Sequence, residues 1–307
     1  MDEKESALVV AVRELTAETR RARRWRTAFA VVPLLVLLLL LLALLDGEAS
    51  LPTQDPHTAR IDVFGPILTQ APASAEFVNQ SLRAAFEEEQ AKGVVLRINS
   101  PGGSPVQADR INAEIRRLRA EYPEKKVYAV VEDLCASAAY YIAVAADEIY
   151  VNSSSLVGSI GVIASGFGMV DLIQEWGIER RVTASGRHKA MLDPFLPQNP
   201  EAEAHLQEMV DRLHRQFERI VKEARGDRLT AADEEVFDGR IWTGDQAREM
   251  GLVDGFSDVL QVARDLVGAE EVVNYTYEPD LLERVVDRVG ARLGQIAESW
   301  LRTPVRF

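Results

Sequence analysis

The chain has 307 residues, of which 47% are hydrophobic and 27% are charged, a balance that allows one large packed domain or two small ones. Its net charge of -13 excludes nucleic-acid binding through the general electrostatic field. The single cysteine, Cys135, excludes an intrachain disulfide and leaves the redox compartment open.

Residues 27–45 form an apolar run of 19 residues without a charged side chain. As an α-helix, this run would be roughly 28 Å long, close to the thickness of the hydrocarbon core of a bilayer. Five arginines lie within residues 20–26, and the acidic residues Asp46 and Glu48 follow the run. By the positive-inside rule, the N-terminus is then cytoplasmic and the chain after residue 46 is outside.

Two other interpretations of this run are a cleaved signal peptide and a buried core helix. A signal peptide usually has a shorter apolar region, of about 7 to 15 residues, followed by a small-residue cleavage site. The arginines clustered at one end argue against a core helix. We therefore predict a single-pass protein of the inner, cytoplasmic membrane, with a cytoplasmic segment at 1–26, a transmembrane helix at 27–45 and a linker at 46–58.

From Ala59 onward, short apolar strands alternate with helical patterns, which is typical of an α/β fold with mainly parallel strands. A long helical pattern at about 200–225 follows, and a shorter one at 243–251 begins with threonine and ends with glycine. We predict one domain at 59–268 and an amphipathic C-terminal tail at 269–307. The predicted strands lie at 60–67, 93–100, 125–133 and 147–155, and the predicted helices between them at 75–91, 104–122 and from Ser137 onward.

The turn "NSPGGS", residues 99–104, directly follows a buried strand and precedes a helix. In open parallel sheets, ligands bind at the carboxyl ends of the strands. The adjacent glycines Gly102 and Gly103 let backbone amides approach a ligand closely, and such amides can stabilise an oxyanion. An ordinary strand-to-helix turn explains the pattern equally well.

Ser137 follows the next predicted strand and a short loop, and it lies at the start of a predicted helix. Its ordinary role there would be to cap the helix. As a nucleophile it would need a base, and of the four histidines only His188 is a candidate, with a carboxylate still to be assigned. The neighbouring Lys189 is the alternative, because a lysine in an apolar site can accept a proton near neutrality, although most lysines are exposed. We expect His57 in the linker, and His205 and His214 on a charged helix surface.

Five motifs occur in one order: "LRINSPGG" at 96–103, "ASAAYYIA" at 136–143, "VGSIGV" at 157–162, "SGRHKA" at 185–190 and "TGDQAREMGLVD" at 243–254. Together they resemble the signal peptide peptidase A (protease IV) family of Ser-Lys dyad peptidases over residues 59–268. The ordered set is far more specific than any single motif. The resemblance implies a crotonase/ClpP-like αββ fold, with Ser137 as nucleophile, Lys189 as base and Ser159 orienting the lysine. It also implies an oxyanion site at Gly102, Gly103 and Ala138.

The family further implies a homo-oligomeric ring in which a neighbouring protomer completes the site, and it implies hydrophobic peptides, such as signal peptides or unfolded proteins, as substrates. No metal or cofactor is expected, since no Cys/His cluster has ligand spacing. The sequence departs from the family at Ala138 and Ala139, where two glycines are usual, which affects substrate fit. Cys135 is expected to line the site without acting as nucleophile. The alternatives are an inactive membrane scaffold, a crotonase-type acyl-CoA enzyme and a protease of stomatin relatives.

Overall fold

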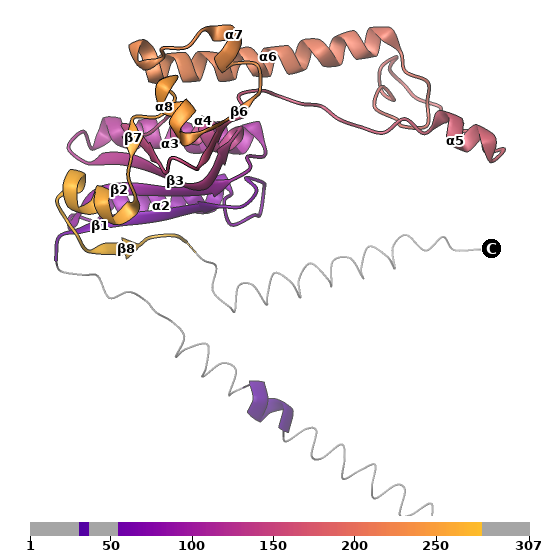
Figure 1. Cartoon of the computed structure of the whole chain (residues 1–307). Helices are drawn as coiled ribbons and strands as arrows, with labels where there is room; N and C mark the ends of the chain where they lie inside the picture. The colour runs from indigo at the N-terminus through magenta and orange to yellow at the C-terminus, as the bar shows by residue number, and fades with distance from the viewer. Residues whose placement is uncertain (1–30, 37–54, 278–307) are drawn as a thin grey trace, which may run out of the picture. The chain divides into compact units, whose positions relative to one another are not determined.

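The computed structural model describes residues 31–36 and 55–277 (Figure 1). The chain divides into two units, one of residues 1–52 with 279–307 and one of residues 53–278. In the first unit, residues 31–36 are helical and exposed. The predicted cytoplasmic segment, most of the predicted transmembrane helix and the tail from residue 278 lie outside the described residues. Within residues 31–36 and 55–277, no helix combines the length and hydrophobicity needed to cross a membrane.

The second unit is built on a mixed sheet, so the predicted α/β class is confirmed. Its described strands follow the order β6-β5-β3-β2-β1-β8, with β4 beside β3 and β7 beside β4. The three central strands are parallel and nearly continuously buried because their side chains are apolar on both faces. The strands are β1 (His57–Phe64), β2 (Ala91–Ser100), β3 (Lys126–Ala136), β4 (Glu148–Val151), β5 (Leu156–Gly158), β6 (Ile241–Thr243), β7 (Gly255–Phe256) and β8 (Val272–Asn274).

Strand β3 has different partners along its length. Its first half pairs with β4, and its last three residues pair with β5. Strand β5 then pairs antiparallel with β6. As a result, the carboxyl end of β3 lies between the end of β2 and the short strand β5.

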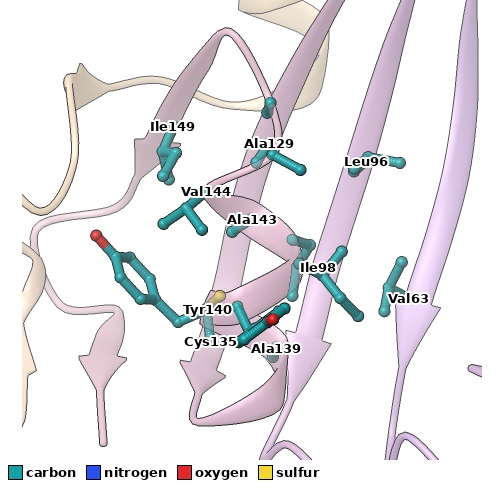
Figure 2. Close-up of a cluster of buried hydrophobic side chains, with 14 of the residues drawn as sticks. Val63, Leu96, Ile98, Ala129, Cys135, Ala139, Tyr140, Ala143, Val144 and Ile149 are labelled. Carbon is teal, nitrogen blue, oxygen red and sulfur yellow. The ribbon is translucent and has the colours of Figure 1, made fainter. Parts of the chain in front are cut away.

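Three helices cover one face of the sheet: α2 (Ala75–Glu87), α3 (Pro105–Glu121) and α4 (Ala138–Ala143). Serines cap the first two, since the hydroxyls of Ser74 and Ser104 accept hydrogen bonds from backbone amides in the first turn. Figure 2 shows part of the core, where Tyr140 and Ala143 of α4 lie in one buried cluster with Leu96 and Ile98 of β2.

The remaining helices follow the predicted order. Helix α6 (Pro200–Arg225) has the predicted bounds, with Pro200 in its first turn. Its C-terminal part packs on the body of the domain, whereas its first half projects beyond the sheet together with the preceding segment (Figure 1). That segment, residues 161–199, is called the arm below. The other elements are α5 (Val170–Glu175) in the arm, then η1 (Gly226–Arg228), α7 (Asp233–Val236), α8 (Gly244–Glu249), α9 (Val259–Val262) and η2 (Ala263–Val267).

Two predictions at the ends of the domain are wrong. His57 was expected in the linker, but it begins β1, is 1% exposed and has its Nε2 2.8 Å from the hydroxyl of Tyr275. Residues Val272–Asn274 were expected in the tail, but they form β8 and pair with β1. Both segments are ordered by a pairing between chain positions more than 200 residues apart, which no local pattern reveals.

Candidate active site

Ser137 occupies a sharp turn between the end of β3 and the start of α4. Its backbone has φ 54° and ψ -121°, a conformation that costs a non-glycine residue about 1–3 kcal/mol. Two hydrogen bonds hold it there: the Ser137 amide donates to the carbonyl of Gly158 at 2.8 Å, and the Tyr141 amide donates to the carbonyl of Ser137 at 3.0 Å. The half-buried hydroxyl makes no capping hydrogen bond. The ordinary capping role is therefore not what this serine performs.

Gly102 lies directly against this turn. A Cβ atom there would stand 2.7 Å from the carbonyl oxygen of Ala136 and 2.9 Å from the amide nitrogen of Ala138. The φ of Gly102 is also positive, at 97°. Only glycine fits this approach, so the sequence motifs around Gly102 and Ser137 meet in space as the strand order predicts.

Gly103 forms a parallel bridge with Ile67. The bridge uses the carbonyl of Gly102, which accepts from the Ile67 amide, and the amide of Ser104, which donates to the Ile67 carbonyl. The amide of Gly103 consequently points away from Ile67. The Gly102 amide is already engaged, since it donates to the hydroxyl of Ser100 at 3.1 Å.

Two backbone amides beside Ser137 are therefore available to a ligand. Within residues 55–277, the amides of Gly103 and Ala138 have no hydrogen-bond acceptor. Sequence reasoning treated Gly102 and Gly103 as equivalent and missed Ser100, whose hydroxyl distinguishes them. The serine is inside the "NSPGGS" motif, but its contact depends on the exact turn, so the motif alone could not assign it.

The alanine pair after Ser137 is accommodated by the core. Ala138 is 5% exposed and Ala139 is fully buried. Both methyl groups are therefore packed within the body of the domain.

Cys135 is fully buried in β3, within the cluster of Figure 2. Burial strongly raises the pKa of its thiol. Since the thiolate is the nucleophilic form, this cysteine is unreactive at neutral pH.

Ser159 lies on the other side of Ser137, because β5 pairs with the end of β3 so that Ala136 faces Gly158. Ser159 is half-buried, has φ 51° and donates its amide to the carbonyl of Arg240 at 2.7 Å. The pairing of β5 with β3 thus places Ser159 next to the turn at Ser137.

Lys189 is exposed and lies in the arm. It lines a cavity of about 710 Å³ whose walls are formed only by residues between 180 and 195. No residue of β3, α4 or β5 contributes to this cavity, and no contact between Lys189 and Ser137 or Ser159 occurs in the described chain. A single chain therefore does not bring the predicted nucleophile and base together.

The histidines do not supply a base for Ser137 either. His188 belongs to the arm, where its Nε2 lies 3.7 Å from a carboxylate oxygen of Glu201. His214 is 2.9 Å from Glu218 on the surface of α6, and His57 contacts Tyr275 at the far end of the sheet. Within the described residues, no group of three or more His, Cys, Asp or Glu side chains could hold a metal ion.

Comparisons with known proteins give this arrangement a context. The sequence model of Peptidase family S49 matches residues 119–272. The chain is 41% identical over 217 residues to the Na(+)/H(+) antiporter NhaA of Brucella melitensis, an alignment that covers 70% of this chain but only 29% of that relative. It is 35% identical over 216 residues to a candidate protease of Synechocystis sp., covering 69% of this chain and 75% of the relative.

Among solved structures, a mutant of the membrane-bound stomatin-specific protease 1510-N aligns with 73% of this chain and 99% of its own, at 15% identity and a TM-score of 0.45. The sequence matches are closer. Half of the chain matches the family model, and one relative is aligned over three quarters of its length. This chain therefore belongs to peptidase family S49, the signal peptide peptidase A family.

Proposed function

We propose that this chain is a membrane-anchored serine endopeptidase in which Ser137 is the nucleophile and Lys189 of a neighbouring protomer is the base. The observation that carries the proposal is the backbone of Ser137, with φ 54° and ψ -121° and a hydroxyl free of any capping bond. Strain of this kind persists only where the surrounding structure enforces it, and it exposes a nucleophile at the top of a strand-to-helix turn.

The proposed reaction is acyl transfer. Neutral Lys189 accepts the proton of the Ser137 hydroxyl as the Oγ attacks a peptide carbonyl, and the amides of Gly103 and Ala138 stabilise the oxyanion. Lys189 then protonates the leaving amine, and water hydrolyses the acyl-enzyme. Ser159 would orient the lysine, in keeping with its position beside Ser137.

Delivery of the base by a second protomer is supported by the arm. Lys189 does not reach Ser137 of its own chain, and the arm exposes large apolar side chains that a second copy would cover. A ring of such protomers, with the crotonase/ClpP-like αββ architecture that the family resemblance implies, would place each arm against the next body. In that setting the side chain of Lys189 would be enclosed between its own arm and the neighbouring body.

The membrane anchor is proposed from sequence, since most of the apolar run at 27–45 lies outside the described residues. Its length and the arginines before it support a single span with the peptidase domain outside the cytoplasm. The substrates we propose are signal peptides and other hydrophobic segments of unfolded proteins, for which an anchored enzyme is well placed.

The test uses four full-length proteins in detergent: the wild type and the variants Ser137→Ala, Lys189→Ala and His188→Ala. Hydrolysis of an unfolded protein should fall at least about a thousandfold in the first two variants and stay within a few-fold of wild type in the third. A fluorophosphonate probe should label Ser137 of the wild type. Full activity in Ser137→Ala or Lys189→Ala would end the dyad proposal, and loss only in His188→Ala would favour a histidine triad.

The same experiment separates the alternative functions. An inactive scaffold of this fold would neither hydrolyse the substrate nor react with the probe. An acyl-CoA enzyme would bind CoA and leave peptides intact.

A further inference from the structure

We propose that Asn112 is a positioning residue that sets the direction of the Ala138 amide beside Ser137. This inference rests on the proposed function, in which Ser137 attacks and the Ala138 amide stabilises the oxyanion. It concerns a side chain of α3 that does not itself touch a substrate.

Within residues 55–277, the short helix α4 leaves one carbonyl near its C-terminal end without a backbone donor. The Val144 amide donates to the carbonyl of Tyr140, and the Ala145 amide donates to the carbonyl of Ile142, each at 3.0 Å. The carbonyl of Tyr141, which lies between these two in the chain, accepts no backbone hydrogen bond within the described residues. A buried carbonyl in this position needs a partner from outside the helix.

Asn112 is that partner. Its Nδ2 donates to the carbonyl of Tyr141 at 2.7 Å, and the side chain is 1% exposed. Residue Tyr141 is held at its other end as well, because its hydroxyl donates to a carboxylate oxygen of Asp109 at 2.8 Å. Helix α3 therefore fixes both the main chain and the side chain of Tyr141.

Tyr141 in turn fixes the turn at Ser137, since its amide donates to the carbonyl of Ser137 at 3.0 Å. The carbonyl of Ser137 and the amide of Ala138 belong to one planar trans peptide group, in which they point in opposite directions. Holding the carbonyl toward Tyr141 consequently directs the Ala138 amide to the opposite side, where it has no acceptor within the described residues. Asn112 is thus linked to the Ala138 amide through two hydrogen bonds: its own bond to the Tyr141 carbonyl, and the bond from the Tyr141 amide to the Ser137 carbonyl.

The chain offers a matched control in Asn79. This residue of α2 is 7% exposed, and its Nδ2 donates to the carbonyl of Arg110 in α3 at 3.3 Å. In both asparagines the Oδ1 atom has no partner within the described residues. Each side chain thus donates from its Nδ2 to a backbone carbonyl, but within the described residues Asn79 makes no hydrogen bond to α4.

The experiment compares full-length Asn112→Leu with Asn79→Leu, because leucine has a similar size and removes the amide without adding a charge. Asn112→Ala and Asn79→Ala provide a second pair if a leucine variant fails to fold. For each protein, kcat and KM are measured on a quenched fluorescent peptide, together with the rate of fluorophosphonate labelling and the unfolding temperature.

We expect Asn112→Leu to lower kcat and the labelling rate by about tenfold to a hundredfold, because a misdirected oxyanion donor weakens transition-state binding. KM and the midpoint of the pH profile should stay unchanged, since neither substrate binding nor Lys189 is altered. Asn79→Leu should lower the unfolding temperature by a comparable amount and retain kcat.

Wild-type kcat in the Asn112 variants, or an equal loss of kcat in the Asn79 variants, would overturn the positioning role. Failure of the proposed function has a different signature, because the wild-type protein would then not be labelled at Ser137 at all.

Discussion

Ser137 and Lys189 lie in two regions of the chain that differ in how much surface they bury. Around Ser137, every residue of α4 is buried, and two backbone hydrogen bonds, to β5 and from α4, hold the turn. In the arm, α5 has no buried residue, and several large apolar side chains are exposed. The most exposed are Ile163 at 89%, Phe167 at 82%, Trp176 at 73% and Leu192 at 68%.

This difference indicates which half of the proposed site one chain can complete alone. A turn that carries backbone strain needs surroundings that determine it fully, and the body supplies them. A large exposed apolar surface such as that of the arm is typical of a region that another molecule covers. Under the proposed function, one chain thus preforms the turn that carries the nucleophile, whereas the base is delivered by assembly.

Among substitutions that test the difference between the body and the arm, Gly102→Ala is expected to have the largest effect. The added Cβ would meet backbone atoms of Ala136 and Ala138 at 2.7 and 2.9 Å, and it would also impose a positive φ on alanine. Displacement of the turn should lower peptide hydrolysis by about a hundredfold and reduce the unfolding temperature. In the arm, Gly166 has open space around it, so Gly166→Ala is the control and should leave both measurements unchanged. Normal activity in Gly102→Ala would show that the close approach at this turn is unnecessary.

Asp254→Asn is expected to have the next largest effect, on the stability of the body. Asp254 accepts hydrogen bonds from the buried Arg225 at 2.8 and 3.0 Å and from the Ile149 amide at 2.7 Å. Burial opposes its ionisation, but these partners and Arg228 outweigh it and lower the pKa of Asp254. The variant should lose about 2 kcal/mol of unfolding free energy at pH 7.

The pH dependence of that loss provides the check. Because the pKa is lower in the folded state, ionised Asp254 stabilises the fold above its unfolded pKa of about 3.9, and this contribution disappears as the pH falls through the folded value. The difference in unfolding free energy between wild type and Asp254→Asn, measured by urea unfolding, should therefore decrease below about pH 4. Glu179→Gln in the arm removes an exposed pair with Arg181 and should change nothing measurable. A difference in unfolding free energy that stays constant down to pH 2 would contradict a stabilising role for ionised Asp254.

The smallest effect is expected from Trp176→Ser, which tests the arm as an interface. Removing one exposed aromatic side chain should weaken self-association of the full-length protein in detergent about tenfold, as seen by analytical ultracentrifugation. The unfolding temperature of the diluted protein should not change, because the body does not depend on this residue. An unaltered association constant would indicate that Trp176 faces solvent or lipid in the assembly.

Local patterns predicted the elements well wherever a single segment determines them. Pro200 in the first turn and the amphipathic repeat fixed helix α6, and apolar runs fixed the central strands. The turn at Gly102 and the serine at the helix start were also found, because a parallel sheet brings the carboxyl ends of its strands to one edge. Sequence could not assign β8 or His57, which are ordered by distant pairing, nor the role of Ser100.

The base illustrates a different limit. The motif around the proposed base Lys189 is recognisable, but the described residues of a single chain do not bring Lys189 into contact with Ser137 or Ser159. If a side chain functions only in contact with a second copy, the structure of one chain does not show that contact. It shows only the exposed apolar surface that the second copy would cover. Asn112 shows the opposite case, since a polar residue facing the core of an amphipathic helix is a signal that sequence reasoning could have used.

The most direct test of base delivery between protomers mixes two inactive proteins. Ser137→Ala and Lys189→Ala are unfolded or dissociated together, reassembled in equal amounts and assayed for peptide hydrolysis. If each site combines the serine of one protomer with the lysine of the next, random mixing restores about one quarter of wild-type activity, because one site in four then has both residues. If both residues must come from the same chain, the mixture stays as inactive as its components, and the account of a site shared between protomers is wrong.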